Sequence, residues 1–409
     1  GLQEIFQWIV LRDTEKIFLM CFPQVKSYLA YVLVYTFYFL SFALFSSLIS
    51  VYMLGLGFSA GQTSVVVSVA FFASMLAQPI MGILNDRLSI KKVTLFSFGA
   101  IIFIAIYFMQ VRDLLGLTIG YSLVIMLING VNPVMDVLAA RSPYTYGKIR
   151  IWGTIGYALG SQLAGVLYQY VSPMAIFIAF IGAMIITIVG VLSIKIRSES
   201  PKSDEVPKTK KDSYISQILT NKTYLYYLLI VALYSGVGNA GHTYIPAMLQ
   251  HSGLSVGMAS TVVSISVICE SPLIFYSYLF MDKLSAKKLL LCPLLIMLVQ
   301  YTIYGLNLGL ASKIILTLAS KHVSGMLLIM VTLKIVSAIV DSKYLVTAIA
   351  LVQTVRSLGS IFIQHFAGAV IDAAGYETMS FFLAGLMVLV IALAWFLKVP
   401  EKEDQKLFS

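Results

Sequence analysis

Several ionisable side chains stand inside long apolar stretches of this sequence, where a charge is costly unless it has a partner or a function, and six of them are the main candidates for a functional site. They are Asp136, Arg150, Glu270, His322, Lys334 and Arg356. Carboxyl, guanidinium and imidazole groups together offer hydrogen-bond donors and acceptors for a polar ligand. A carboxyl group shielded from water also favours its neutral form, so it can take up and release a proton. The pattern indicates solute binding and proton exchange.

Asp136 and Arg150 flank a short turn at Ser142-Pro143. Helices on either side of such a turn run antiparallel, and each residue lies about 10 Å from it at a rise of about 1.5 Å per residue. We therefore expect the two groups at similar depth, where they can neutralise each other and still bind a polar ligand. The alternative is a structural ion pair near the cytoplasmic interface, with Arg150 extending its charged end towards water.

Glu270 is our first candidate for a proton-coupling residue, and Asp136 is the second. Both are carboxyl groups in apolar surroundings, which is the setting in which a carboxyl group exchanges protons most readily. The alternative for Glu270 is a structural pairing with Lys334 or Arg356. His322 follows Lys321, and it is either a ligand or a hydrogen-bonded packing residue.

The composition requires a membrane. Of the 409 residues, 59% are hydrophobic and only 11% are charged, and the mean hydropathy is +0.91. A water-soluble chain of this length could not bury so much apolar side chain, so soluble enzymes and nucleic-acid-binding proteins are excluded. The formal net charge of +10 comes from short clusters of Lys and Arg between apolar runs, as in membrane proteins with many spans.

No catalytic, metal or cofactor motif is present. We find no HExxH, GxSxG or GxxxxGK[ST] pattern, and the four histidines are far apart in the sequence and predict no cluster (His242, His251, His322, His365). The three cysteines have no zinc or redox spacing. We therefore expect no enzyme activity, no metal and no cofactor, with a proton gradient as the energy source.

Twelve apolar segments are long enough to cross a bilayer, which takes about 20 residues. They are 28–53, 62–84, 91–111, 115–139, 146–170, 173–195, 223–247, 255–280, 288–309, 314–339, 344–371 and 378–397. A polar stretch rich in Lys, Pro and Ser separates the first six from the last six. The predicted organisation is an N-terminal cytoplasmic or interfacial segment (1–27), a six-helix bundle (28–196), a linker (197–222), a second six-helix bundle (223–397) and a tail (398–409).

Lys and Arg residues gather in the linker, the tail and alternate loops, which predicts that these parts face the cytoplasm. Residues 1–26 are too charged for the core of a signal peptide. We expect a multi-pass protein of the bacterial inner membrane with both termini in the cytoplasm.

The two halves of the sequence repeat. Residues 57–69 (GFSAGQTSVVVSV) match residues 253–265 (GLSVGMASTVVSI) at an offset of 196, and the same offset carries 86–93 (DRLSIKKV) onto 282–289 (DKLSAKKL). A weaker match joins Gly156, Ala164 and Gly165 to Gly359, Ala367 and Gly368 at an offset of 203. Two homologous bundles joined by a linker are the plan of a transporter that binds its solute between the halves.

The loop GILNDRLSIKK (82–92) resembles the loop between helices 2 and 3 of the major facilitator superfamily, and its second copy begins at Asp282. The resemblance implies an all-α membrane protein of twelve helices in two homologous six-helix bundles. We expect gating or conformational roles for Gly82, Asp86, Arg87, Asp282 and Arg356. Lys91 and Lys92 are expected to hold the next helix at the anionic leaflet, or to act only as topology charges.

A second resemblance is to the lactose-permease-like branch of oligosaccharide and nucleoside proton symporters. It rests on PVMD (133–136) followed by YGKIRIWGTIGY (146–157), on CESP (269–272) and on VRSLG (355–359). The resemblance implies that Asp136 and Arg150 bind a sugar, that Tyr157 stacks on it, and that Glu270 contacts it in the proton pathway. His322 and Arg356 fall near a histidine and a lysine of that branch.

The departures from that branch limit the carry-over of its mechanism. Gly325 stands where the branch has a proton-carrying glutamate, and Gln300 stands near the place of an arginine. The seventh span offers Asn239 and His242 where the branch has an aspartate. We therefore predict solute contacts from Asp136, Arg150, Tyr157, Glu270, Gln300 and His322, without a complete copy of the proton relay.

The predicted function is proton-coupled symport of a small polar solute, a sugar, oligosaccharide or nucleoside, by alternating access. The alternative is a proton-antiport efflux pump for drugs or metabolites, for which Glu270 alone would serve. The expected partners are the solute, protons and the lipid bilayer, with no nucleic acid, and the protein is expected to be a monomer.

Overall fold

The computed structural model describes residues 27–87, 90–140, 142–144, 146–194, 219–340 and 345–400. Within these ranges the chain is helical and contains no strand. The predicted N-terminal segment (residues 1–26), most of the linker and most of the tail lie outside the described residues. The first half of the molecule is the described residues before the linker, and the second half is those after it.

Long helices make up the first half. The opening helical segment (27–46) turns at residues 47–48 and continues as α2. The helices after this turn are α2 (Ile49–Gly55), α3 (Ala60–Arg87), α4 (Ile90–Gln110), α5 (Leu114–Ala140), α6 (Tyr146–Tyr170) and α7 (Pro173–Ser193). They agree with the predicted segments to within a few residues.

The second half follows the same plan with two interruptions. Its helices are α9 (Lys222–His251), α10 (Val256–Ile268), α11 (Ser271–Phe275), α12 (Ser277–Phe280), α13 (Ala286–Leu306), α14 (Leu310–Ile339) and α15 (Leu345–Phe396). The predicted continuous segment 255–280 is interrupted at Cys269-Glu270, because Pro272 has no N–H with which to continue the helix. In α15 the break lies at Gly375, whose φ of 83° is non-helical, so the two segments predicted there meet at that glycine.

Nine helices of the described chain are long and apolar enough to cross a membrane. Neither α6 nor α9 is among them, although they have 25 and 30 residues. These two helices carry polar groups near their middle, among them Tyr157 and His242. Helices that line a polar interior are less apolar than helices that face lipid on most of their surface. The count of twelve spans stays a prediction.

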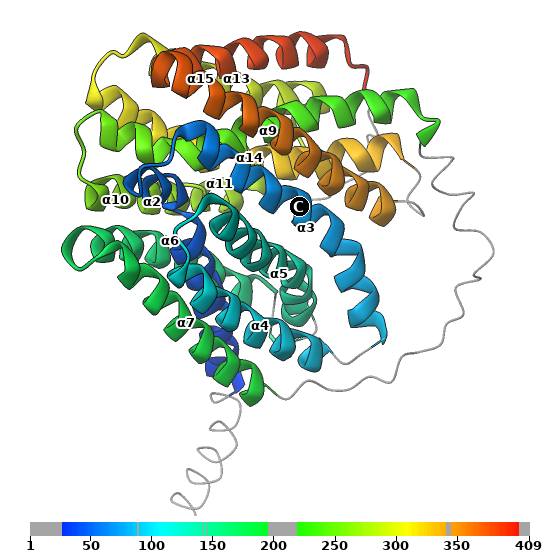
Figure 1. The fold of residues 1–409 in the computed structure, drawn as a ribbon. Helices are drawn as coiled ribbons and strands as arrows, with labels where there is room; N and C mark the ends of the chain where they lie inside the picture. The colour runs from blue at the N-terminus through cyan, green and yellow to red at the C-terminus, as the bar shows by residue number, and fades with distance from the viewer. Residues whose placement is uncertain are drawn as a thin grey trace, which may run out of the picture.

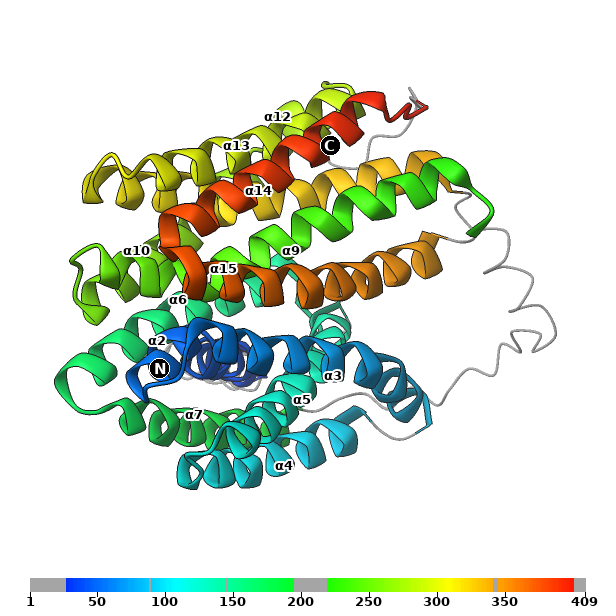
Figure 2. The same ribbon diagram turned by 45° about the horizontal axis from the view of Figure 1, so that its top comes forward.

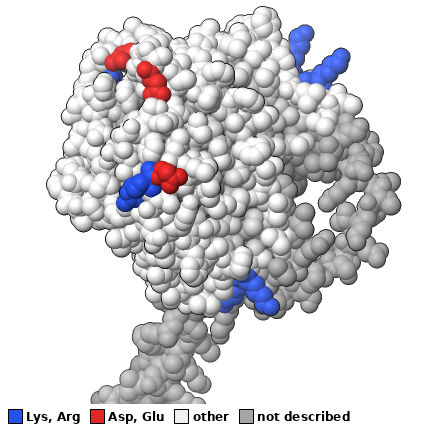
Figure 3. Space-filling view, viewed as in Figure 1, with Lys and Arg blue, Asp and Glu red and all other residues white. Residues whose placement is uncertain are grey.

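Large apolar side chains cover the outside of the molecule. Phe96, Phe103 and Ile178 are 79%, 76% and 61% exposed, whereas serine and threonine side chains are buried between the helices. Figure 3 shows an outer face on which charged side chains are few and scattered. This arrangement is the reverse of a water-soluble protein and matches a lipid environment.

The buried apolar side chains form two clusters. The first is drawn almost entirely from residues 30–194, and the second almost entirely from residues 224–397. In Figures 1 and 2 the helices α9, α13, α14 and α15 lie together on one side, and α4, α5 and α7 lie on the other. The halves meet where α6 packs on α10 and where α3 packs on α15.

The repeat predicted from the sequence recurs in local structure. Gly57 and Gly253 both adopt a positive φ, 92° and 109°. Two residues later, Ser59 and Ser255 each accept a hydrogen bond from a backbone N–H one turn into the following helix. A glycine that leaves the left-handed region free and a serine N-cap together start a helix in each half.

The contacts between the halves also occur in pairs at equivalent positions, related by the sequence offsets of 196 and 203. Ser264 Oγ donates to the carbonyl of Ala158 at 2.6 Å, and the equivalent Ser68 Oγ donates to the carbonyl of Ile361 at 3.2 Å. Both contacts join a helix of one half to a helix of the other.

Two further equivalent contacts cap helix N-termini across the interface. Gln169 Oε1 accepts from the N–H of Gly257 at 2.7 Å. Its equivalent, Asp372, accepts from the N–H groups of Ala60 and Gly61 at 2.9 and 2.7 Å. These contacts lie at the end of the molecule distant from the linker, so the halves are held together at that end.

The lysines of the repeated loop have a structural task that the sequence did not reveal. Lys91 Nζ donates to the carbonyls of Leu192 and Ile194 at the end of α7, at 2.9 and 3.1 Å. Its equivalent, Lys287, donates to the carbonyl of Trp395 near the end of α15. The prediction that Lys91 only anchors its helix to lipid or sets the topology is therefore incomplete, because each lysine also caps a helix C-terminus of its own half.

Candidate functional site

Glu270 lies where the helical path of α10 is broken. Its N–H bonds to the carbonyl of Val267 at 3.3 Å, and α11 begins one residue later. The break follows from Pro272, which cannot donate to a carbonyl one turn earlier. The carboxyl group therefore stands at an irregular point of backbone in the membrane, and such points are tolerated where they line protein or a polar interior.

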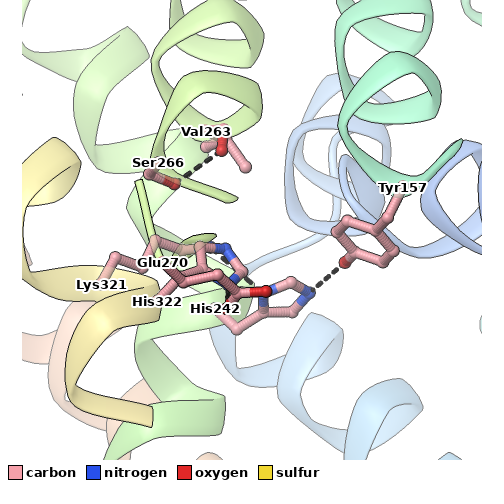
Figure 4. A network of polar contacts seen from close by, with 7 residues as sticks. All are labelled: Tyr157, His242, Val263, Ser266, Glu270, Lys321 and His322. Carbon is pink, nitrogen blue, oxygen red and sulfur yellow. Dashed lines mark hydrogen bonds and ion pairs between the residues drawn. The ribbon is translucent and has the colours of Figure 1, made fainter. Parts of the chain in front are cut away.

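Lys321 and His322 are consecutive residues near the middle of α14. Lys321 Nζ lies 3.1 Å from Nε2 of His322 and 3.3 Å from Nδ1 of His242 on α9. The rings of His242 and His322 are 6.5 Å apart between centroids. The expectation that the histidines do not cluster is therefore wrong for this pair, because helix packing joins residues 80 positions apart (Figure 4).

Tyr157 connects this group to the first half. Its hydroxyl lies 3.2 Å from Nε2 of His242. Figure 4 shows Tyr157 reaching from α6 towards His242 across the space between the two halves. A polar contact between the halves at mid-membrane is where a transporter of this plan binds its solute.

A neutral amine has two N–H bonds and one lone pair, so a neutral Lys321 would fix no direction of donation. An ammonium group has no lone pair, so the charged form of Lys321 donates to both His242 and His322. The proton of His242 is then on Nε2 and is donated to Tyr157, and that of His322 is on Nδ1. In the first helical segment, the hydroxyl of Ser46 donates to the carbonyl of Phe42 at 2.7 Å.

Glu270 faces His322 across a gap slightly longer than a hydrogen bond. Its Oε2 is 4.0 Å from Nδ1 of His322, the nitrogen that carries the proton in this arrangement. Its carboxylate also interacts electrostatically with Lys321 and with Arg150 of the first half. Lys334 instead donates to the carbonyls of Met281 and Leu284, so the structural pairing of Glu270 with Lys334 is not formed.

Arg150 lies on an aromatic ring. Its guanidinium carbon is 4.3 Å from the centroid of Phe39, a cation–π contact between α6 and the first helical segment. A Cβ added at Gly153 would come within 2.5 Å of the guanidinium and 2.8 Å of the ring, so this glycine makes room for the stack. A planar guanidinium held on a ring has a fixed orientation.

The remaining predicted residues lie elsewhere. Gln300 is 2% exposed and bonds to Tyr304 at 3.2 Å in the packing of the second half, rather than to the network in Figure 4. Arg356 donates to Ser235 at 3.1 Å, joining α15 to α9, and shows no pairing with Glu270. Asp282 lies in the turn before α13. Asp136, Gly82, Asp86 and Arg87 lie on α5 and α3, and their side chains are outside the described residues.

Two members of the network are absent from the predicted solute contacts. The sequence marks His242 only as the occupant of a position that holds an acid in the resembling branch, and Lys321 only as the neighbour of His322. The signal for Lys321 was available, since it is an ionisable residue inside an apolar segment. The described residues contain no group of three or more His, Cys, Asp or Glu side chains that could hold a metal ion.

The network therefore offers donors and acceptors to a polar solute, and a carboxyl group that can exchange a proton. Its members come from both halves, so a solute that bridges Tyr157 and Glu270 would contact both at once. No nucleophile–base pair of a catalytic site accompanies them among the residues in Figure 4.

Comparison with known proteins places the chain in a family. Residues 28–384 match the model of the MFS_1 like family. The sucrose permease of Escherichia coli is 23% identical over 404 residues, which are 93% of this chain and 96% of that protein. The raffinose permease of Escherichia coli is 21% identical and covers 82% of this chain and 83% of its own length. The crystal structure of the nucleoside transporter NupG has a TM-score of 0.77 at 16% identity, covering 90% of this chain and 98% of its own.

Proposed function

This chain belongs to the MFS_1 like family, it is a major facilitator transporter of the lactose-permease-like branch, and we propose that it is a proton-coupled symporter of a sugar-like solute. The two halves would rock against each other so that the binding site opens alternately to each side of the membrane, and the solute would cross in this way. The proposal rests on one observation above all: Tyr157 of the first half bonds to His242 of the second half.

A sugar is favoured over a nucleoside by the comparisons. Relatives that cover 93%, 82% and 85% of the chain are named as permeases of sucrose, raffinose and melibiose, whereas the likeness to the nucleoside transporter extends to the fold alone. A sugar has several hydroxyl groups that donate and accept at once, and the network presents both kinds of partner. A guanidinium held on Phe39 could donate to a pair of hydroxyl oxygens.

The contacts between the halves support an inward-facing conformation. Asp372 and Gln169 cap helix N-termini across the interface at the end distant from the linker. We predict from the positive residues that the linker is cytoplasmic. The closed end would then face outwards, and rocking of the halves would open it and close the linker end.

Glu270 is the proposed proton carrier. Its carboxylate is partly shielded, with 12% of the side chain exposed, and its described ion-pair partner is a histidine rather than a lysine or arginine. Such a carboxylate can be protonated without breaking a strong ion pair. We propose that protonation of Glu270 accompanies solute binding and that its release follows solute release to the cytoplasm.

The test uses purified protein in lipid vesicles with a radiolabelled sugar taken from a thermal-shift screen. With the outside acidic, the wild-type protein should accumulate the sugar, and Glu270→Gln should accumulate at least about tenfold less because the amide does not ionise near neutral pH. Exchange of labelled for unlabelled sugar at equal pH should persist. The matched control is Ser74→Ala, at the equivalent position of the first half, which should accumulate as the wild type does.

Equal loss of accumulation and exchange in Glu270→Gln would make Glu270 a binding or structural residue. Undiminished accumulation would exclude it as the proton carrier. If no sugar of the screen raises the melting temperature, although ligands of the folded state must do so, the sugar-symporter proposal fails.

A further inference from the structure

Lys321 differs from the other membrane lysines in its partners. Lys334 donates to two carbonyl oxygens and Lys313 to the hydroxyl of Ser252 at 2.8 Å. Lys321 instead contacts two imidazole nitrogens, and among the described side chains no carboxylate oxygen lies within ion-pair distance of its Nζ. An ammonium group that is partly shielded from water inside a membrane protein normally has a negative partner, because shielding without one is costly.

The contacts also leave Lys321 a free donor. An ammonium group has three N–H bonds, and the two imidazoles of His242 and His322 accept two of them. Glu270 does not take the third, since it approaches His322 and reaches Lys321 only through longer-range electrostatics. In its ammonium form the group therefore has one further donor and a positive charge that the neighbouring imidazoles cannot neutralise.

Arg150 is a less suitable counter-charge for a ligand. Its guanidinium lies on Phe39 and interacts electrostatically with Glu270, so part of its charge is already offset. Lys321 lies deeper in the second half, beside His242 and thus next to the contact with Tyr157. A negative group of a solute bound between the halves would meet Lys321 at that place.

We propose that the solute is an acidic sugar whose carboxylate pairs with Lys321 while its hydroxyl groups contact Tyr157 and Glu270. This inference rests on the proposed function and names its substrate class. An ionised Glu270 offsets the charge of Lys321 and disfavours a second carboxylate nearby, whereas a protonated Glu270 favours it. Proton and anion would then bind together, and transport of a monoanion with one proton would carry no net charge.

The test compares acidic sugars with their neutral counterparts on the wild-type protein. Galacturonate and glucuronate are compared with galactose and glucose, and with the methyl esters of the two acids, as competitors of labelled galacturonate or galactose uptake into vesicles. We expect the acids to compete at concentrations at least about tenfold lower than the esters, as for a hydrogen bond to a charged group. Uptake of the acid should respond to a pH gradient and not to a membrane potential.

Variants of Lys321 provide the second arm. Lys321→Gln should lose the preference for acid over ester, Lys321→Arg should retain most of it, and Lys288→Gln, an exposed lysine at a helix start, should behave as the wild type. The preference is the ratio of the competing concentrations of ester and acid, measured on the same variant. A lower yield of folded protein therefore does not change this ratio. The competition assay on the wild type needs no variant at all.

The possible outcomes separate the two proposals. If neutral sugars are taken up and bind as well as the acids, the symporter stands and the acidic-sugar inference is overturned. Uptake of acids that a membrane potential drives would overturn the electroneutral coupling. If neither acids nor neutral sugars are bound, both proposals fail.

Discussion

Ser46 of the first half and His242 of the second half occupy equivalent positions, 196 residues apart; Ser46 donates to the carbonyl of Phe42 in its own segment, whereas His242 bonds to Tyr157 of the other half. The equivalent of Glu270 is Ser74, which donates to the carbonyl of Ala70 in its own helix. Across the offset of 203, the equivalent of Arg150 is Gln353. At each of these three pairs of equivalent positions, one half has an ionisable group and the other has a small or neutral polar side chain.

The framework residues behave in the opposite way. A Cβ on Gly156 would lie 2.1 Å from the carbonyl oxygen of Thr36, and one on Gly359 would lie 2.0 Å from that of Ala232. Thr36 and Ala232 are themselves equivalent positions of the repeat. The comparison teaches that the two halves share their packing contacts and differ in their chemistry, as expected when a duplicated scaffold binds one asymmetric solute.

The largest effect should follow from substitution of the two close-contact glycines. In Gly156→Ala and Gly359→Ala the new methyl group meets backbone, which cannot move aside, so each should destabilise the protein by about 2–3 kcal/mol. The controls are Gly182→Ala and Gly385→Ala, which are also equivalent positions and have nothing within 4 Å of an added Cβ. Melting temperatures of the four purified variants measure this.

Similar losses in the two glycine variants would support a shared framework. A large loss in one and none in the other would show that the halves pack differently in spite of the repeat.

The next effect distinguishes the two interface caps. Asp372→Ala removes two hydrogen bonds to a helix N-terminus and a favourable charge there, and Gln169→Ala removes one neutral bond. We expect the first to favour opening of the closed end by about 1–2 kcal/mol and the second by about 0.5–1 kcal/mol. Spin labels at Val171 and Gln250, on a background without native cysteines, report the distance between the halves at that end.

In this measurement the longer-distance population should grow more in the Asp372 variant than in the Gln169 variant. An unchanged distribution in both would mean that these caps do not hold the end closed.

The smallest effect concerns the lysine caps. Lys91→Gln and Lys287→Gln should each lower the stability by about 0.3–1 kcal/mol, because each removes a positive charge from a helix C-terminus. Lys288→Gln is the control, since its side chain is exposed beside Lys287. Melting temperatures at low and high salt check this, and the loss should shrink at high salt. A loss in only one of the two lysine variants would break the equivalence of the halves at this position.

Much of the fold could be predicted from the sequence. The mean hydropathy and the lengths of the apolar runs required a helical membrane protein, because backbone groups in lipid must bond within their own segment. The repeat at an offset of 196 predicted equivalent helix starts, and the structure has them at Gly57 and Gly253. The break before Pro272 was also encoded locally, although we predicted a continuous segment there.

The candidate site could be predicted only in part. Apolar context marks Glu270, His322 and Arg150 as unusual residues. An ionisable group inside an apolar segment can be recognised from its neighbours in the sequence alone. Nothing local shows that Lys321 lies between His242 and His322, or that Tyr157 reaches His242 from the other half. The contacts of His242 join residues 79 to 85 positions apart on different helices, and only helix packing places them within hydrogen-bond distance.

The sequence by itself determined the class of protein, the helices and the duplication, because each depends on the transfer of side chains and backbone from water to lipid. The tertiary structure decided which charges meet. In the folded protein Lys334 donates to carbonyl oxygens and Lys321 contacts two imidazoles, although both are lysines of the same helix. Electrostatic interactions depend on distances of a few ångströms, and those distances are fixed only when the helices pack.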